Sequence, residues 1–554
     1  MRQLQKMPVW VWLCIISFVP LLSLFTPGLP ITHDGPDHVA RIANFYASLK
    51  EGILIPRWAA NLNWGYGHPI LMFLYPFPSY AGSFFHALGF SFVDSTKLVF
   101  AVSFIASTLA MYLWLRRIFH PAGAVVGSLL YSFAPYRFVD LYVRGAIGEH
   151  VAFIFPPLVC YFLHRLSLEK SNMNNVLFAA GLSGSMAGLI LAHNAIALMF
   201  IPIFALYAIY ILRYEAIQRI LFFFLSNIAI LFGFGLSAFF WIPAFFEGKY
   251  TLRDIVTAGE VLTRFVPWNH FVYSPWSFGG TDLLSKSLGL AGILTVMVSL
   301  FGIGKLHMKK ERILLYGSVF LLVVTLVLMT ELSKPVWSAI TLLQKFQFPW
   351  RFLSVTTFLV AVIGSIVTDV AEKQVSKHTF RILSIGIFVL IILPTVGMWH
   401  PRAYEVRSES IFKEVYRSTT DTGESSPIWS VRFMEHTPSA AVEIIQGEAT
   451  VSQGVRTTTT REYAVSAATE SRILENTLYF PGWTVYVDGS KTDIQFQDPQ
   501  YRGLMTFMVP QGQHTVLIRF EDTKIRKVAQ YISLISALAL AIALGCALIW
   551  KRKK

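Results

Sequence analysis

Long apolar runs recur along the whole chain, and each is close to the length that a helix needs to cross a lipid bilayer. A hydrocarbon core about 30 Å thick is spanned by about 20 apolar residues in a helix. Only 14% of the residues are charged, whereas soluble domains carry about 25%. This chain has too little polar surface to cover its apolar residues in water, so the sequence predicts a polytopic α-helical membrane protein.

Twelve spans are predicted from these runs. They lie at residues 8–28, 95–119, 121–135, 150–166, 174–191, 193–212, 218–246, 286–304, 312–330, 350–371, 379–398 and 527–550. The first run is too long for a signal peptide and lacks a small-residue cleavage site, so we predict that it is retained as a span. Segment 69–90 is apolar but contains three prolines, and we expect it to be re-entrant or interfacial, without crossing the membrane.

Basic residues mark the same side of the predicted spans throughout. They lie at Arg2 and Lys6, Arg116–Arg117, Arg165 and Lys170, Arg213 and Arg219, Lys305–Arg312, Lys373–Arg381 and Lys551–Lys554. Because Lys and Arg favour cytoplasmic loops, we predict that both termini are cytoplasmic. The opposite loops are richer in Trp, Tyr, Pro and carboxylates and are expected to be extracytoplasmic. The longest of them are 29–94 and 399–526.

The segment 399–526 differs in kind from the rest of the chain. It is polar and rich in β-branched residues, with runs at Val455–Val465, Leu478–Val487 and His514–Phe520. Asp488-Gly489 directly after such a run is a hairpin signal. We predict three parts: a multi-span domain at 1–398, an extracytoplasmic β-sandwich at 399–526, and a last helix with a basic tail at 527–554.

Several functional classes lack support in the sequence. No Walker loop, no GxGxxG after a strand and no HExxH motif occurs, which argues against nucleotide-driven chemistry. The net charge of +14 follows the loop ends, without a basic stripe carrying interleaved aromatics, so nucleic acid is not an expected partner. Cys14, Cys160 and Cys546 each lie in an apolar run, so no disulfide and no cysteine metal site is expected.

A first cluster of acids and imidazoles, THDGPDH at residues 32–38, follows the first span. The sequence predicts that an amphipathic helix begins here, with Asp34 or the next residue as its N-cap, and lies along the membrane interface. Asp34, Asp37 and His38 are candidates for a general base or a metal site. The alternative is a purely structural cluster, in which Asp34 caps the helix and Asp37 pairs with Arg41.

A second cluster lies in the short loop after the third span, where two arginines run against the charge rule for outer loops. Arg137 and Arg144 are candidates for binding a phosphate, because a guanidinium matches phosphate oxygens bidentately. Glu149 and His150 open the next predicted span, where a carboxylate is costly and is often functional. The alternative is that the two arginines pair with Asp140 and Glu149.

Three further clusters occupy the same predicted side of the membrane. His193 and Asn194 form a turn between two spans and are candidates either for a ligand contact or for a helix–helix hydrogen bond. Arg351, in KFQFPWR at 345–351, can hold a lipid phosphate or extend to headgroups. The Trp- and Tyr-rich stretch 56–68 suits sugar stacking or interfacial anchoring equally well.

These motifs together resemble a bacterial family of membrane proteins. HDGPDH, WGYGHP, APYR with RGA, AHN and QFPWR are similar to the membrane proteins described as 6-pyruvoyl-tetrahydropterin-synthase-related. The tail motifs YFPGWTVYVDG and VPQGQHT are similar to the end of YfhO-like membrane proteins. Both groups resemble GT-C glycosyltransferases, which are multi-span enzymes that use polyprenyl-phosphate sugars on the outer face. The resemblance implies a GT-C-like bundle in a bacterial inner membrane.

The resemblance implies an inverting transferase that moves a sugar from a polyprenyl-phosphate donor to an extracytoplasmic glycan, lipid or protein acceptor. The roles that it implies fall on the residues singled out above. Asp34, Asp37 and Glu149 are the candidate catalytic acids, and His38, Arg137, Asp140, Arg144, His150, His193, Asn194 and Arg351 are candidates for binding the substrate or its phosphate. A divalent cation and its ligands stay open, because Asp-Gly-Pro-Asp departs from the usual acidic pair. The alternative function is a non-catalytic protein that binds, transports or scaffolds lipid-linked envelope precursors.

Overall fold

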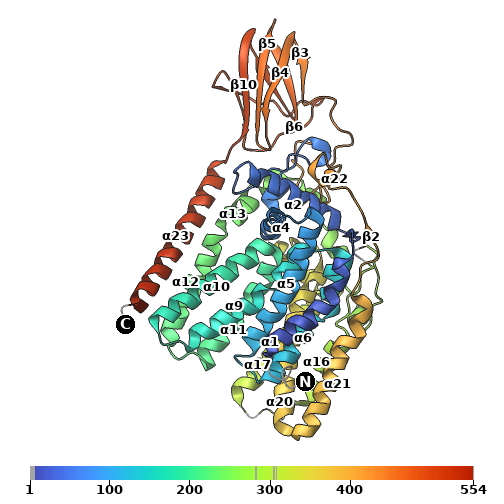
Figure 1. Ribbon diagram of the computed structural model, residues 1–554, viewed down its shortest axis with the longest axis vertical. Helices are drawn as coiled ribbons and strands as arrows, with labels where there is room; N and C mark the ends of the chain where they lie inside the picture. The colour runs from blue at the N-terminus through green and yellow to red at the C-terminus, as the bar shows by residue number, and fades with distance from the viewer. Residues whose placement is uncertain (1–6, 281–282, 303–305, 307, 553–554) are drawn as a thin grey trace.

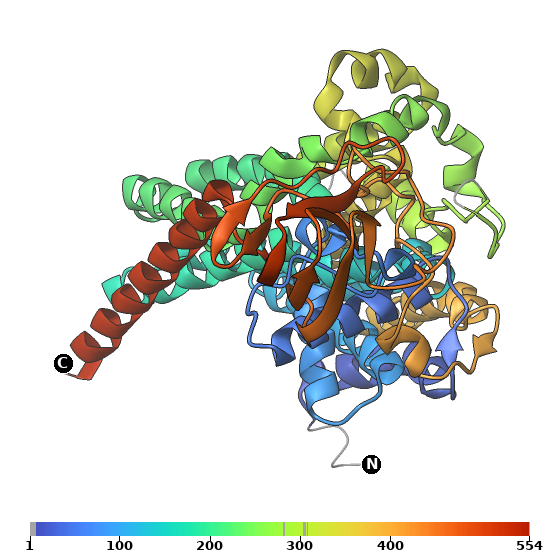
Figure 2. The same cartoon turned by 90° about the horizontal axis from the view of Figure 1, so that it is seen from above.

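The computed structural model describes residues 7–280, 283–302, 306 and 308–552 of the chain. A bundle of helices carries an all-antiparallel sheet domain on one of its ends, which we call the sheet end (Figure 1). The helix α23, Lys524–Arg552, leaves the sheet domain and descends along one side of the bundle (Figures 1 and 2). The predicted basic positions Arg2, Lys6, Lys305, Lys553 and Lys554 lie outside the described residues.

Nine helical stretches among the described residues are long and apolar enough to cross a membrane. They are Phe92–Leu115, Ile147–Leu168, Asn172–Ala192, Asn194–Tyr214, Arg219–Leu236, Lys309–Leu328, Pro349–Gln374, Lys377–Met398 and Lys524–Ile549. Each corresponds to a predicted span. In the element numbering they comprise α5, α8–α9, α10, α11, α12, α17, η9–α20, α21–η10 and the greater part of α23.

The other three predicted spans form helices that are short within the described residues. They are α1–η2 (Val9–Phe18 and Val19–Phe25), α6 (Pro121–Ser132) and α16 (Leu290–Gly302). The 12 residues of α6 rise only about 18 Å at 1.5 Å per residue, less than the hydrocarbon thickness. The long predicted span 218–246 divides at Ser237 into α12 (Arg219–Leu236) and α13 (Ala238–Glu247).

Short helices cover the sheet end of the bundle. They are α2 (Gly35–Lys50), α3 (Ile70–Phe73), α4 (Phe77–Ala87), α7 (Pro135–Phe138), the π-helical η4 (Val139–Arg144), α14 (Arg253–Val256), α15 (Trp268–Val272), α18 (Lys334–Ala339), α19 (Thr341–Gln344) and α22 (Ser410–Lys413). Prolines at 69, 76 and 78 divide segment 69–90 into α3 and α4, neither of which is long enough to cross a membrane.

The sheet domain consists of two antiparallel sheets. One has the strand order β4-β5-β10-β7-β8 and the other has the order β3-β6-β9. The strands are β3 Val442–Gln446, β4 Ala449–Arg456, β5 Thr460–Ala467, β6 Ser471–Leu478, β7 Trp483–Val487, β8 Ser490–Thr492, β9 Leu504–Val509 and β10 Gly512–Phe520. Asp488-Gly489 closes the β7–β8 hairpin with positive φ at both residues, which confirms the predicted turn.

Two of the predicted β-branched runs each extend over a turn between two strands, which their composition does not indicate. Val455–Val465 is not one strand, because it spans the turn between β4 and β5. Leu478–Val487 likewise joins the end of β6 to β7 across Pro481 and Gly482. Residues 399–441, which we call the connecting segment, run across the sheet end before the first strand of these sheets and contribute β2 (Tyr404–Glu405), which pairs with β1 (Leu29–Pro30).

The predicted interfacial role of α2 is wrong, because the helix is enclosed by protein. Its apolar residues pack against α4 and α5, and its polar residues meet the connecting segment and the sheet domain. Arg41 Nε donates to Thr420 Oγ1 at 2.9 Å, and Asn44 Oδ1 accepts a bond from the backbone N–H of Asn61 at 3.0 Å. The polar face that the sequence predicts for this helix is therefore a buried interface with the connecting segment and the first loop.

The aromatic stretch 56–68 is also more deeply placed than predicted. Trp58 is 0% exposed and packs edge-on against Trp483 of β7, with ring centroids 5.3 Å apart. Neither sugar stacking nor membrane anchoring is open to a ring in this position. The first loop and the sheet domain therefore share one apolar core.

Candidate functional site

Two short segments meet at the sheet end and bring the first two sequence clusters together. The backbone N–H of His33 donates to the carbonyl of Val143 at 3.0 Å, and that of Asp34 donates to the carbonyl of Arg144 at 2.9 Å. Gly145 has a φ of +67°, and a Cβ at this position would lie 2.3 Å from Thr32 Oγ1. Glycine therefore permits both the left-handed backbone and the close approach of the two segments.

Glu149 is the hub of the cluster that results. Its Oε1 accepts hydrogen bonds from Arg144 Nη2 at 2.8 Å and from Arg351 Nε at 2.9 Å. The Tyr136 hydroxyl donates to the other oxygen, Oε2, at 2.7 Å. Glu149 is 1% exposed, and a buried carboxylate requires paired charges and hydrogen bonds of this kind.

Asp140 shares Arg144 with Glu149. Arg144 Nη1 donates to Asp140 Oδ1 at 2.6 Å, while Asp140 Oδ2 is buried without a hydrogen-bond partner among the described residues. Burial, followed by the nearby charge of Glu149, raises the pKa of Asp140. Arg144 also lies over the Trp350 ring, with 4.6 Å from Cζ to the centroid. The pairing of Arg144 that the sequence allowed as an alternative is therefore present.

The pairing allowed for Asp37 and Arg41 is absent from the described structure. Asp37 accepts a hydrogen bond from the Tyr416 hydroxyl at 3.1 Å. Arg41 bonds Thr420 through Nε and His38 Nδ1 through Nη1, the latter at 3.1 Å. Among the described residues no carboxylate oxygen forms an ion pair with Arg41, which is 6% exposed.

Burial changes the protonation of the groups around Arg41. It raises the pKa of Asp37, because a charged carboxylate is poorly solvated there. Burial, together with the charge of Arg41, lowers the pKa of His38 well below its usual range, so this imidazole is neutral at pH 7. Its Nε2 is buried without a hydrogen-bond partner among the described residues.

Tyr75 links the two halves of the cluster. Its ring stacks on His193 with centroids 4.7 Å apart. Burial raises its pKa to about 12, and the charges of Arg41, Asp34, Glu149 and Arg351 all act on its hydroxyl. Tyr75, His38 and Arg41 also line a cavity of about 10 Å³, which is about the room that one water needs.

Asp34 occupies the N-cap position of α2 but does not act as the predicted side-chain cap. Its carboxylate is half-buried and makes no hydrogen bond or ion pair with any described residue. Asp34 is thus an acid that is held in place by its backbone while its side chain is left available.

His193 and Asn194 differ in how close they lie to the hub. His193 Nε2 is 3.9 Å from Glu149 Oε1, and its Nδ1 accepts the backbone N–H of Ile196 as a helix cap. Asn194 Oδ1 accepts the next backbone N–H, that of Ala195, at 2.9 Å. The predicted turn therefore places its histidine at the cluster, while its asparagine serves the start of α11.

Arg137 and His150 lie behind the cluster, among aromatic rings. Arg137 is 0% exposed, donates to Ser107 Oγ at 2.8 Å, and has its Cζ 4.0 Å from the centroid of the Phe153 ring. His150 stacks on Phe104 with centroids 5.9 Å apart. The structure therefore separates these two residues from the arginines at the hub.

The connecting segment completes the site with residues that the sequence did not single out. Glu424 accepts hydrogen bonds from Gln347 at 2.6 Å and from Arg253 at 3.2 Å, and Gln347 in turn accepts one from Arg351 at 3.1 Å. Thr420 and Tyr416 of the same segment hold Arg41 and Asp37. No periodicity or motif marks these positions, and Tyr75 and Tyr136 look like ordinary interfacial aromatics in the sequence.

The acids at the sheet end do not form a set of three metal ligands. Glu149 and Asp140 are bonded to arginines. Among the described residues, the one group of three His, Cys, Asp or Glu ligand atoms within 4.8 Å of one another is His120, Asp369 and Glu372. These residues lie at the opposite end of the bundle, where the Asp369 carboxylate also binds Lys373 at 2.7 Å.

Comparison with known proteins identifies one family and several distant relatives. The family described as 6-pyruvoyl-tetrahydropterin synthase related domain, membrane protein, matches residues 71–401. An uncharacterized protein of Lactococcus lactis subsp. cremoris (strain MG1363) is 23% identical over 269 residues, which are 47% of this chain and 43% of that protein. The matched part thus spans less than half of that relative.

Solved structures overlap with this chain only loosely. Arabinofuranosyltransferase AftD from mycobacteria has a TM-score of 0.43 at 13% identity, covering 72% of this chain and 27% of AftD. The oligosaccharyltransferase of Archaeoglobus fulgidus, in complex with Zn and sulfate, scores 0.37 at 14% identity, covering 74% and 53%. ArnT from Cupriavidus metallidurans, bound to undecaprenyl phosphate, scores 0.30 at 10% identity, covering 66% and 77%.

Proposed function

The chain belongs to the 6-pyruvoyl-tetrahydropterin-synthase-related family of membrane proteins, and on that premise we propose that it is a GT-C-type glycosyltransferase. In this proposal it is a bacterial inner-membrane enzyme whose sheet end faces outward. It transfers a sugar from a polyprenyl-phosphate donor to an acceptor glycan, lipid or protein. The observation that carries the proposal is the meeting of an available acid, Asp34, with a buried cluster of arginines at one end of the bundle.

Asp34 is the proposed general base, because its carboxylate is the one at the cluster without a protein partner among the described residues. It would accept the proton of the acceptor hydroxyl, whose oxygen attacks the anomeric carbon. The new carbon–oxygen bond forms as the bond from that carbon to the phosphate oxygen breaks, and the polyprenyl phosphate leaves with the electron pair. Attack opposite the leaving group inverts the anomeric centre.

The leaving phosphate requires fixed positive charge, since charge in a partly dry site is stabilised chiefly by preorganised donors. Arg137, Arg144 and Arg351 are the sequence candidates for this role, and of these Arg144 and Arg351 are held in place by Glu149. Arg41 is a further proposed contact, because it is buried on the helix whose N-cap position Asp34 occupies and makes no ion pair with a described carboxylate. His38 would then position Arg41, while Asp140 and Glu149 would position the two arginines at the hub.

A second candidate function is supported by the closed state of the hub. Glu149 neutralises charge on Arg144 and Arg351, and Thr420 and His38 occupy two nitrogens of Arg41. A hub whose arginines are already bonded in this way also suits a non-catalytic protein that binds or scaffolds a lipid-linked precursor. The acceptor, the donor sugar and the transfer step belong to the first proposal alone.

The test compares Asp34→Asn with the wild type in proteoliposomes that contain a radiolabelled polyprenyl-phosphate sugar. We expect transfer and donor turnover to fall by about 10²–10⁴-fold, the usual contribution of a general base, with unchanged expression and melting temperature. Asp94→Asn is the matched control, because Asp94 is exposed and pairs with Lys97 away from the cluster. An unchanged transfer rate and an unchanged cellular glycolipid profile in Asp34→Asn would remove Asp34 from the mechanism.

A binding measurement separates the two candidate functions. If the wild type consumes no polyprenyl-phosphate sugar but retains the lipid with saturable affinity, the scaffold function is favoured. If it turns the donor over, we expect Arg41→Gln to weaken the reaction while Asp94→Asn leaves it intact.

A further inference from the structure

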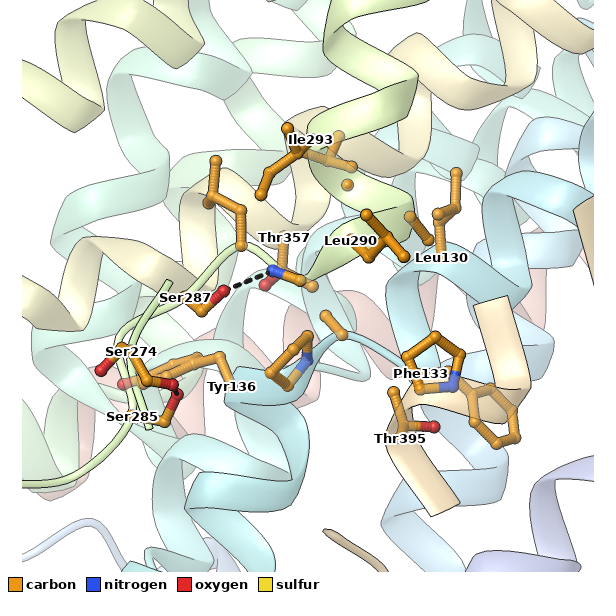
Figure 3. A pocket seen from close by; sticks show the side chains of 18 of the residues that line it. Leu130, Phe133, Tyr136, Ser274, Ser285, Ser287, Leu290, Ile293, Thr357 and Thr395 are labelled. Atoms are coloured by element: carbon orange, nitrogen blue, oxygen red, sulfur yellow. Dashed lines mark hydrogen bonds between the residues drawn. The ribbon is translucent and has the colours of Figure 1, made fainter. Parts of the chain in front are cut away.

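A cavity lies next to the cluster, lined by residues that were not singled out from the sequence. It has a volume of about 540 Å³ and is enclosed by α6, α16, α20, α21, η10 (Leu393–Met398) and the loop that precedes α16. Pockets for small organic ligands typically measure about 300–1,000 Å³. Figure 3 shows Ser274, Ser285 and Tyr136 grouped on one side of this pocket, apart from Leu130 and Leu290.

The chemistry of the lining favours a hydrocarbon over a sugar. No charged side chain and no histidine is present among the lining residues. The hydroxyls of Ser285, Thr356 and Thr395 already donate to backbone carbonyls. Few polar atoms of the lining remain open, among them the buried Nε1 of Trp276, which has no hydrogen-bond partner among the described residues. A sugar ring would therefore leave most of its hydroxyls without partners there, at a cost for each, whereas an aliphatic chain needs only apolar contact.

The depth and opening of the cavity suit a ligand that enters from the bilayer. Its α20 wall runs from Leu353 to Val360, a stretch that rises about 10 Å along a helix. That length is about a third of a hydrocarbon core. Leu290 and Met297 of α16 line the cavity although each is 51% exposed, so the cavity opens sideways on the apolar surface of the bundle.

Tyr136 connects this cavity to the cluster. Its ring belongs to the cavity wall, and its hydroxyl donates to Glu149, which also binds Arg351. Leu353, another wall residue, follows Arg351 by two positions at the start of α20. A lipid whose chain fills the cavity would therefore carry its headgroup to the Glu149–Arg351 pair.

We propose that this cavity holds the hydrocarbon chain of a polyprenyl-phosphate lipid, with the phosphate directed past Tyr136 toward Arg351. The identity of this lipid rests on the proposed function, while the existence of a chain-binding cavity does not. Bulk phospholipid is the competing source of a hydrocarbon chain, and the experiment separates the two.

Gly292 offers a way to fill the cavity with a matched control. A Cβ there would meet Leu288 and Val360, both wall residues, at an ordinary 3.6 Å. Gly292→Ala therefore adds little, whereas Gly292→Phe places a ring in the cavity. Gly317→Phe on α17 controls for an added ring elsewhere, because a Cβ there meets nothing within 4 Å.

The probe is a polyprenyl phosphate with a diazirine on its chain, added to the full-length protein in nanodiscs and mapped by mass spectrometry after illumination. We expect labelling on α16 and on the first turns of α20. It should fall by about tenfold or more, equivalent to about 1.4 kcal/mol of affinity, in Gly292→Phe but not in the two controls. Met297→Trp, which also enlarges a side chain on the α16 wall of the cavity, gives the same measurement where Gly292→Phe does not accumulate.

Three outcomes overturn the proposal, in part or in whole. Labelling that is spread over the outer helix faces, or that persists in both filled variants, removes the cavity as the site. Competition by phosphatidylglycerol as strong as that by unlabelled farnesyl phosphate makes bulk phospholipid the occupant. Sugar transfer without cavity labelling refutes this inference alone, whereas cavity labelling without any transfer supports the inference and counts against the proposed function.

Discussion

Arg144 and Arg351 bind the same oxygen of Glu149, yet their removal should have unequal effects on stability. Arg144→Met leaves two buried carboxylates short of a partner, because Asp140 loses its one ion pair and Glu149 loses one of two. Breaking a buried pair from one side costs about 3–5 kcal/mol. Loss of the contact with the Trp350 ring adds to this effect.

Arg351→Met should be milder. Glu149 keeps Arg144 and Tyr136 as partners, and the Arg351 side chain is 12% exposed, so water can replace part of what is lost. Arg351→Met removes one charge-assisted hydrogen bond to Glu149, of about 1.5–3 kcal/mol, and the bonds from Arg351 Nη1 to the Phe346 carbonyl and to Gln347 Oε1. Those two acceptors are uncharged, so Arg144→Met, which strands two carboxylates, should still be the more destabilising of the two, by about 1–2 kcal/mol.

Both variants can be compared with the wild type by denaturant titration in mixed micelles, followed by tryptophan fluorescence and by protease resistance. The double variant Arg144→Met/Asp140→Asn is the diagnostic control, because it removes the stranded charge. We expect it to be more stable than Arg144→Met alone, which is a coupling of the kind that neighbouring sites show. Equal effects of the two arginine variants, or no recovery in the double variant, would refute the account of Glu149 as a shared hub.

Two further changes test the two sides of the cluster. Gly145→Ala should destabilise the protein by at least about 1–2 kcal/mol, the cost of a left-handed backbone at a residue with a Cβ. Because the new Cβ meets Thr32 Oγ1, adding Thr32→Ala to this variant should recover part of the lost stability in the same denaturant titration. Burial raises the pKa of Asp37 above 3.8, so the folded protein holds a proton that the unfolded chain has released, and the wild type loses stability as pH rises through the folded pKa. Asp37→Asn lacks this loss, and its melting temperature relative to the wild type should rise as the pH increases above about 4. A constant difference would contradict the buried placement of Asp37.

Hydrophobic run length predicted much of the bundle, because crossing a membrane sets a length that a sequence must display. Nine of the predicted spans match helices of sufficient length. The hairpin at Asp488-Gly489 was equally readable, since positive φ at two successive residues restricts the choice of side chains. The limits of β4 and β5 at Thr457–Thr459 could not be predicted, because threonine suits both a strand and the turn that separates two strands.

Candidate residues were predicted better than their contacts. A carboxylate at the start of a predicted span and arginines in a predicted outer loop are costly enough to stand out in the sequence, and the structure places Glu149 and Arg144 together. The sequence left open whether Arg41 pairs with Asp37, because helical spacing permits the pair. In the structure Asp37 bonds Tyr416 and Arg41 bonds Thr420, each 379 residues away along the chain. No local sequence pattern encodes contacts between residues so far apart.

The position of these two residues ties the cluster to the sheet domain. Tyr416 and Thr420 belong to the connecting segment, whose backbone also pairs with residues 61–64 of the first loop. That loop carries Trp58 into the core of the sheet domain. A shift of the sheet domain would therefore move the groups that bind Asp37 and Arg41. An acceptor that binds the sheet domain more tightly in one such position than in another would shift the cluster toward the matching arrangement, in proportion to that difference in affinity.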